Sequence, residues 1–355
     1  MEFRPTAEVI ELEDSLEAVN AYFLERRWSD GLPIVPPTPE RVAAMLRGIR
    51  GEPDEVIGRV PPAWHEATLE KLAINAVMAG GLPEYFPVIV AAVEAMLDPA
   101  FNLYGVQATT HPVAPLLIVN GSIAQAIGMN AGAGVFGPGS RPNATIGRAI
   151  RLILMNLGGA WPGAGDMATQ GQPSKYTYCI AENEAESPWA PLHVERGLGP
   201  AESAVTLFGG ENPHNVNDHV SRTASGILTV IADTMATLGS NVKWYFDQSQ
   251  VLVALGPEHA ATIARSGLAK ADVKAFLWEH ARLPFGRLKL GGMWGIHDWP
   301  EWMNATADDE ALLPIVPGPD AILVIVAGGP GKHSSVIPNC TFSRAVTRPI
   351  TRLPA

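Results

Sequence analysis

The chain has 355 residues and a formal net charge of −11, from 25 basic and 36 acidic residues. This acidic balance, without any run of Lys and Arg, argues against nucleic acid as a partner, and no apolar run reaches the roughly 20 residues of a membrane-spanning helix. The N-terminal segment lacks the basic and apolar regions of an export signal. The whole chain has only two cysteines, which indicate no disulfide framework, so a cytoplasmic protein is expected.

The first predicted elements are helical. In 15–28, Leu16, Val19 and Phe23 have helical spacing, and Gly31 and Pro33 end the helix. A Pro-rich connector follows over 32–39, and further helices are predicted near 66–78 and 88–97. We therefore expect a helical and Pro-rich N-terminal segment, 1–50, ahead of the main fold.

The next elements come twice in the same order. A strand at 115–121 is followed by helices ending near 127 and 157, and a strand at 251–256 is followed by helices ending near 264 and 281, after a helix at 227–238. Setting Gly121 on Gly256 also matches Leu117 with Leu252. This pattern predicts an internal duplication into pseudo-symmetric halves, 51–200 and 201–355, although strand, glycine and helix also follow one another in unrelated proteins.

These elements predict an α/β fold with mixed or mainly parallel sheets covered by helices. The apolar run at 321–327 is expected to be a central strand, because its residues are apolar on both faces.

The segment 209–221 carries the densest group of candidate site residues. His214, Asp218 and His219 are residue types that move protons or bind a divalent metal, and Asn215 and Asn217 are types that orient a substrate. We expect catalysis from the first three, with His214 and His219 as the candidate metal ligands. The alternative is that Asp218 caps a helix and its neighbours only shape a turn. No specific ligand spacing is present, so the cofactor stays open.

A second group lies in 175–197. In an extended conformation His193 and Glu195 would point the same way, as a general base and its orienting group. Cys179 is a candidate nucleophile if a nearby cation lowers its pKa. The alternatives are a buried, inert cysteine and an acidic surface loop.

Five further residues in three segments complete the candidates. His111 precedes a predicted strand, and Asn143 is expected to cap a helix beside Arg141, a combination that binds carboxylate or phosphate. The loop at 328–335, GGPGKHSS, lacks the spacing of a nucleotide-binding P-loop, but Lys332 and His333 are candidates for binding an anion.

The chain also resembles a widespread bacterial family of uncharacterised proteins, similar to ones encoded beside small thiol or selenol proteins with a UGSC-type motif. The stretches that carry the resemblance are WSDGLPIVPPTPERV, EKLAINAVMAGGLPEYFPVIVAAVEAM, ATTHPVAPLLIVNG, NATIGRAIRLILMN, TQGQPSKYTYCIAENEAESPW, HNVNDH and GPEHAATIA. The resemblance implies redox or sulfur chemistry on a small metabolite. Because Cys340 lies in PNCTF and no GSC tripeptide is present, the thiol would come from a partner protein.

The sequence therefore predicts a small-molecule enzyme with lyase-type or hydrolytic chemistry, acid/base or metal-assisted, on a small carboxylate-bearing metabolite. The alternative is a noncatalytic binding or scaffold subunit that works with the thiol or selenol partner. Homo-oligomerisation is left open.

Overall fold

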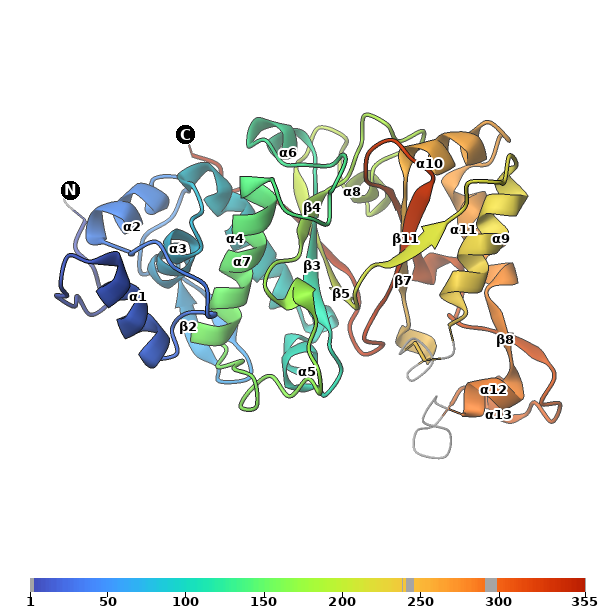
Figure 1. Cartoon of the computed structure of the whole chain (residues 1–355), viewed down its shortest axis with the longest axis horizontal. Coiled ribbons are helices and arrows are strands. Elements are labelled where there is room, and N and C mark those ends of the chain that lie inside the picture. The colour runs from blue at the N-terminus through green and yellow to red at the C-terminus, as the bar shows by residue number, and fades with distance from the viewer. Residues whose placement is uncertain (1–2, 238, 241–245, 291–298, 355) are drawn as a thin grey trace.

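The computed structural model contains two β-sheets packed face to face, with helices on the outer side of each sheet (Figure 1). It describes residues 3–237, 239–240, 246–290 and 299–354. Within these residues the first large sheet has the strand order β12-β5-β3-β4 and the second β10-β7-β11-β6. Both contain parallel and antiparallel neighbours, which confirms the predicted α/β class with mixed sheets.

The described residues include helices before and between the strands of the two large sheets. Their bounds are α1 Leu16–Glu25, α2 Pro39–Leu46, α3 Leu69–Met78, α4 Phe86–Met96, α5 Leu103–Ala108, α6 Ser122–Ala126, α7 Arg141–Asn156, α8 Leu192–Glu195, α9 Ala224–Met235, α10 Pro257–Ala264, α11 Lys270–His280, α12 Phe285–Lys289 and α13 Glu301–Asn304. Short 3-10 helices are η1 Pro83–Tyr85, η2 Pro99–Phe101, η3 Pro173–Lys175, η5 Phe246–Gln248 and η6 Pro319–Ala321. Among the described residues, no single helix is long and apolar enough to cross a bilayer, and only the bent pair Pro83–Met96 and Pro99–Ala108 reaches that length jointly.

The strands form two small two-stranded sheets besides the large sheets. Their bounds are β1 Val56–Val60, β2 His65–Thr68, β3 Ala114–Asn120, β4 Cys179–Ala181, β5 Ala204–Gly210, β6 His214–Asn217, β7 Val251–Leu255, β8 Arg282–Pro284, β9 Leu312–Pro314, β10 Ile322–Val326, β11 His333–Pro338 and β12 Val346–Pro349. Strands β1 and β2 pair with each other, as do β8 and β9.

Capping residues explain where several helices begin. The hydroxyls of Ser15, Thr68 and Thr223 each accept a backbone N–H from the first turn of α1, α3 and α9. The predicted helix at 66–78 is shorter than expected, because residues 65–68 form β2 against β1. The predicted helix at 227–238 ends at Met235, and Leu238 lies outside the described residues.

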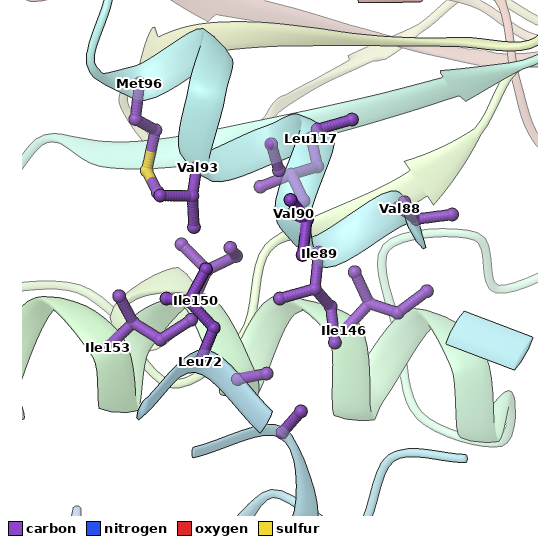
Figure 2. Packing of buried hydrophobic residues seen from close by; sticks show 14 of the residues in the cluster. Leu72, Val88, Ile89, Val90, Val93, Met96, Leu117, Ile146, Ile150 and Ile153 are labelled. Atoms are coloured by element: carbon purple, nitrogen blue, oxygen red, sulfur yellow. The ribbon is translucent and has the colours of Figure 1, made fainter. Parts of the chain in front are cut away.

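Alternation along β3 divides its side chains between two cores. Leu117 and Val119 lie in a cluster with the helices α3, α4 and α7, whereas Leu116 and Ile118 face the other sheet. Figure 2 shows the helix-side cluster, in which isoleucines of α7 point toward α4 and β3.

Strand β7 divides its side chains in the same manner. Val251 and Val253 lie in one buried cluster with residues of α9 and α11, while Leu252 and Ala254 join the core between the sheets. The molecule is therefore a four-layer sandwich of helices, sheet, sheet and helices.

The two large sheets have the same topology. The elements α4, β3, α6, α7, β4 and β5 are repeated in order by α9, β7, α10, α11, β10 and β11, with the second strand parallel and the third antiparallel to the first. In each set the next strand crosses to the other sheet, since β6 pairs with β11 and β12 pairs with β5. Strand β5, Ala204–Gly210, belongs to the first sheet, so the two sheets are not divided at residue 200. The shared order agrees with the predicted duplication, which stays a prediction.

The residue matching drawn from the sequence, however, is wrong in register. Leu117 faces the helices, whereas Leu252 faces the opposite sheet. Because neighbouring residues of a strand point to opposite faces, an odd offset exchanges the faces, and only an even offset superposes equivalent side chains.

Two buried carboxylates fix the N-terminal segment to the first half. Asp30 accepts a forked contact from Arg148 of α7, with both N–O distances 2.8 Å. Glu70 of α3 is 1% exposed and accepts the backbone N–H groups of Thr6 and Ala7. Charge-assisted hydrogen bonds of this kind hold the segment against the core.

Candidate functional site

The carboxyl ends of the parallel strands in both sheets meet at one edge of the sandwich. Asn183, just beyond β4, donates its backbone N–H to Val326 O at 2.7 Å and its side-chain amide to Gly328 O at 3.2 Å, both at the end of β10. Gly328 N in turn donates to Ala131 O, beyond α6. In α/β sheets this edge is where ligands usually bind.

A cavity of about 350 Å³ opens at this edge, between the two sheets. One wall is the loop 133–137 of the first half, which follows α6, and the other is the loop 327–331 of the second half with the ends of β7 and β11. In Figure 1 these segments lie at the top centre, beside the labels α6 and β11. Ala254, Val135 and Ala327 belong to both the cavity wall and the core between the sheets, so the cavity continues that core outward.

Close packing of glycines shapes this cavity. A Cβ atom on Gly256 would lie 2.2 Å from His333 O, and one on Gly329 would lie 2.7–2.8 Å from Ala133. A side chain at either position would force the walls apart. In the described part of the chain, the amide N–H groups of Gly134, Val135 and Phe136 donate to no protein acceptor, so they are available to a ligand.

Polar side chains enter from β11 and β6. Ser335 and Asn215 pair across the two strands, and Ser335 also pairs with Ala254, so their side chains share the face turned to the cavity. His333 is two residues from Ser335 and points to the same face. The Nδ1 atom of His333 lies 3.0 Å from Asn215 Oδ1, and its Nε2 atom lies 3.3 Å from Nε2 of His219.

The amide fixes the proton arrangement of this group. With the Asn215 oxygen toward the ring, Nδ1 of His333 donates, and Nε2 of the neutral ring holds a lone pair directed at His219. The two rings meet edge to face, with planes 76° apart. Lys332 adds positive charge nearby, since its Nζ lies 3.5 Å from His219 O.

A buried histidine supports this edge from the helix side. His259 of α10 is 1% exposed, and its ring joins Ser334 Oγ at 2.8 Å and Asp218 O at 3.2 Å. Because a backbone carbonyl only accepts, Nε2 carries the proton and Nδ1 accepts from the Ser334 hydroxyl. Ser334 alternates with His333 and Ser335, so its side chain points away from the cavity, and the pair holds β11, α10 and the turn after β6 together.

The structure brings together part of the predicted group at 209–221. Asn215 and His219 meet His333, whereas His214 pairs with Val336 on the helix-facing side of the sheet. Residues 214–217 form a strand and not a turn, so His214 shares the face of Val216 and is turned away from the cavity. Asn217 lies opposite His333 in β6.

Asp218 shapes the turn that follows β6. Its Oδ1 accepts the N–H groups of Val220 and Ser221. The helix α9 begins later, after Thr223, so the alternative that Asp218 caps the helix is wrong in position.

The expected arrangement of His193 and Glu195 is also wrong. Both lie on the short helix α8, where side chains two apart point in different directions. Within the described chain His193 is fully buried and neither ring nitrogen has a hydrogen-bond partner, while Glu195 forms ion pairs with Lys270 and Lys274 of α11. Within the described chain, no hydrogen bond or ion pair joins either residue to His214 or His333.

The remaining candidates lie elsewhere. His111 is at the amino end of β3 and contacts Glu211 at 3.0 Å, at the opposite end of the sandwich from His333. Arg141 donates to Gly80 O, and Asn143 binds the backbone of Asn130 rather than capping α7, whose N-cap is Ser140.

Cys179 does not have the environment of an activated nucleophile. It is 5% exposed within β4, and burial raises the pKa of its thiol far above the ordinary value. Burial likewise raises the pKa of Cys340 to about 12. Raised pKa values leave little thiolate near neutral pH.

Glu182 marks the buried polar end of β4. Its Oε2 accepts from Asn120 Nδ2 at 2.6 Å and from Leu192 N at 2.8 Å, while Oε1 has no hydrogen-bond partner within the described residues. Burial raises the pKa of Glu182 above its ordinary value, with a further contribution from Glu184, against the attraction of Lys270.

The raised pKa predicts a loss of stability with rising pH. Stability from Glu182 is fully present below the ordinary value of 4.5 and is lost as pH rises through the higher folded-state value. The loss is about 1.4 kcal/mol for each pH unit between the two values. Glu182→Gln should remove this dependence, measured by urea unfolding across the pH range. Glu186→Gln, on the exposed part of the same loop, is the control and should keep it.

Sequence reasoning missed Ser335, His259 and the wall at 133–137. The alternation in KHSSVIP was a readable signal. Val336 faces the helices, so His333 and Ser335, at odd distances from it along the strand, must point to the opposite face. The loop 133–137 carried no chemical signal beyond its glycines.

Metal ligands do not form a larger cluster: in residues that the structure describes, no group of three or more His, Cys, Asp and Glu side chains is close enough to hold an ion.

Comparisons with known proteins add nothing to this picture, since no family model, curated protein or solved structure matches the chain.

Proposed function

We propose that the chain is an enzyme that acts on a small carboxylate-bearing metabolite held in the cavity between the sheets. The observation that supports this most directly is the contact of His219 with His333, oriented by Asn215, at a cavity formed by both halves. Its volume of about 350 Å³ is near the lower end of small-molecule sites, roughly 300–1,000 Å³.

The proposed chemistry is of lyase type or hydrolytic. His333 acts on the bound molecule, either by proton transfer or through a metal ion, and Ser335 with the amides of 134–136 holds the carboxylate. The positive charge of Lys332 near His219 favours an anionic substrate.

A noncatalytic subunit for a thiol or selenol partner is the second proposal. Buried Cys179 and Cys340, with raised pKa values, favour a partner as the source of any reactive thiol. In this case the cavity would bind a ligand without converting it.

The enzyme proposal is tested with a defined panel of lactate, malate, citrate and pyruvate, followed by mass spectrometry. We expect the wild type to consume at least one member and His333→Gln to be slower by about 100-fold or more. His214→Gln, on the helix-facing side of the same sheet, should retain the wild-type rate.

Equal rates for wild type and His333→Gln would contradict catalysis at this cavity. Binding of panel members without consumption would favour the noncatalytic subunit.

A further inference from the structure

We infer that His219 and His333 are the two protein ligands of a divalent transition-metal site, with zinc as the best fit, completed by a carboxylate bound in the cavity. The metal site stands on the geometry of the two rings alone. The carboxylate as the completing ligand rests on the proposed function.

The distance between the rings matches a shared metal ion. The Nε2 atoms of His219 and His333 are 3.3 Å apart. Two nitrogens at the usual Zn–N distance of about 2.0–2.1 Å, on a tetrahedral ion, are separated by roughly 3.3–3.4 Å. The two Nε2 atoms therefore already have the separation that a shared tetrahedral ion requires.

Asn215 supplies the outer-shell contact that metal-binding histidines usually have. Its oxygen accepts from Nδ1 of His333 at 3.0 Å, which fixes the tautomer that directs the Nε2 lone pair outward. Asn215 and His333 stand on the paired strands β6 and β11, so the ring is anchored by regular structure.

The surrounding charge is mixed. Asp218, next to His219 in the sequence, is 7% exposed, and within the described chain its Oδ2 has no hydrogen-bond partner, so it adds negative charge to the turn that carries His219. Lys332 opposes a cation but favours an anion bound to it.

The ion would keep two positions open. No third His, Cys, Asp or Glu joins the pair in the described chain, so two of four tetrahedral positions are left to water or to a ligand. A carboxylate with a second oxygen donor next to it would occupy both. Because binding free energies are reciprocal, such a ligand must raise the affinity for the metal.

The test uses the full chain, freed of metal by chelation and titrated with Zn²⁺ alone and with Zn²⁺ plus oxalate, followed by calorimetry. We expect one ion per chain and tighter binding in oxalate. His219→Ala and His333→Ala should each abolish the site, and Asn215→Ala should weaken it by about 10- to 100-fold. Asn215→Asp, which keeps an acceptor for Nδ1, should restore binding.

His214→Ala is the matched control, because His214 is an exposed histidine directly before Asn215 in β6 and lies on the other face of the sheet. It should bind Zn²⁺ as the wild type does. Circular dichroism of each variant reports whether the fold is kept.

Wild-type affinity in both His219→Ala and His333→Ala, or an equal loss in His214→Ala, would overturn the inference. The outcome is separable from the proposed function. If the wild type binds no zinc but His333→Gln slows turnover, the metal site is rejected and the proposed enzyme function is kept. If zinc binds but His333→Gln leaves turnover unchanged, the metal site is kept and the enzyme function is rejected. Zinc binding that oxalate leaves unchanged would remove only the carboxylate as the completing ligand.

Discussion

Asp166→Ala is expected to lower the free energy of unfolding by about 3–5 kcal/mol. Asp166 Oδ2 accepts from Arg151 Nη2 at 2.9 Å and from Lys175 Nζ at 2.7 Å. The three side chains are only 4%, 10% and 12% exposed, so removal of the carboxylate leaves two cations buried without compensation. Denaturant unfolding at pH 7 measures the loss.

The control is Glu66→Ala. Its ion pair with Arg59 has the same 2.9 Å separation but lies on the surface, so the expected loss is about 0–1 kcal/mol. Adding Lys175→Met to Asp166→Ala should recover part of the stability, because one uncompensated charge is then removed. Equal losses for Asp166→Ala and Glu66→Ala would show that burial of the network contributes nothing.

The network also gives an acid-side pH dependence. Burial alone raises the pKa of Asp166, but Lys175, the N–H of Ala168 and Arg151 together hold the pKa below its usual value. Stability from this group is therefore present above the unfolded-state value and is lost as pH falls through the lower folded-state value. In contrast, burial lowers the pKa of Lys175 despite the attraction of Asp166.

The central strands could be predicted from the sequence. The apolar runs that became β3, β7 and β10 were readable because each is buried on both faces. The sequence does not indicate which sheet each strand joins. In the structure β3 lies in one large sheet, whereas β7 and β10 pair with each other in the second. The crossing strands β6 and β12 are short and carry few apolar residues, so only tertiary pairing makes them strands.

The candidate site was predicted in part. His219, Asn215 and His333 were all named, but His219 was expected to act with its sequence neighbour His214. The strand HNVN decides otherwise, since burial of Val216 carries His214 to the helix side and Asn215 to the cavity side. The contact of His219 with His333 spans 114 positions and depends on the pairing of β6 with β11, which no local pattern reveals.

Phe208→Ala is expected to lower the free energy of unfolding by about 3–5 kcal/mol and to affect both sheets together. Phe208 of β5 is fully buried in the core between the sheets, opposite Leu116 of β3 and in one cluster with Leu252 and Ile325 of the second sheet. Circular dichroism and tryptophan fluorescence should therefore report one coincident transition, shifted to lower denaturant.

Val220→Ala is the control, since Val220 is 84% exposed and its truncation should change stability by less than about 0.5 kcal/mol.

The core that contains Phe208 also reaches the cavity through Ala254 and Ala327. Loosening it should thus weaken Zn²⁺ binding at His219 and His333, although Phe208 touches neither. Separate transitions of the two halves would mean that the sheets do not share a core, and the cavity between them would then lose its structural basis.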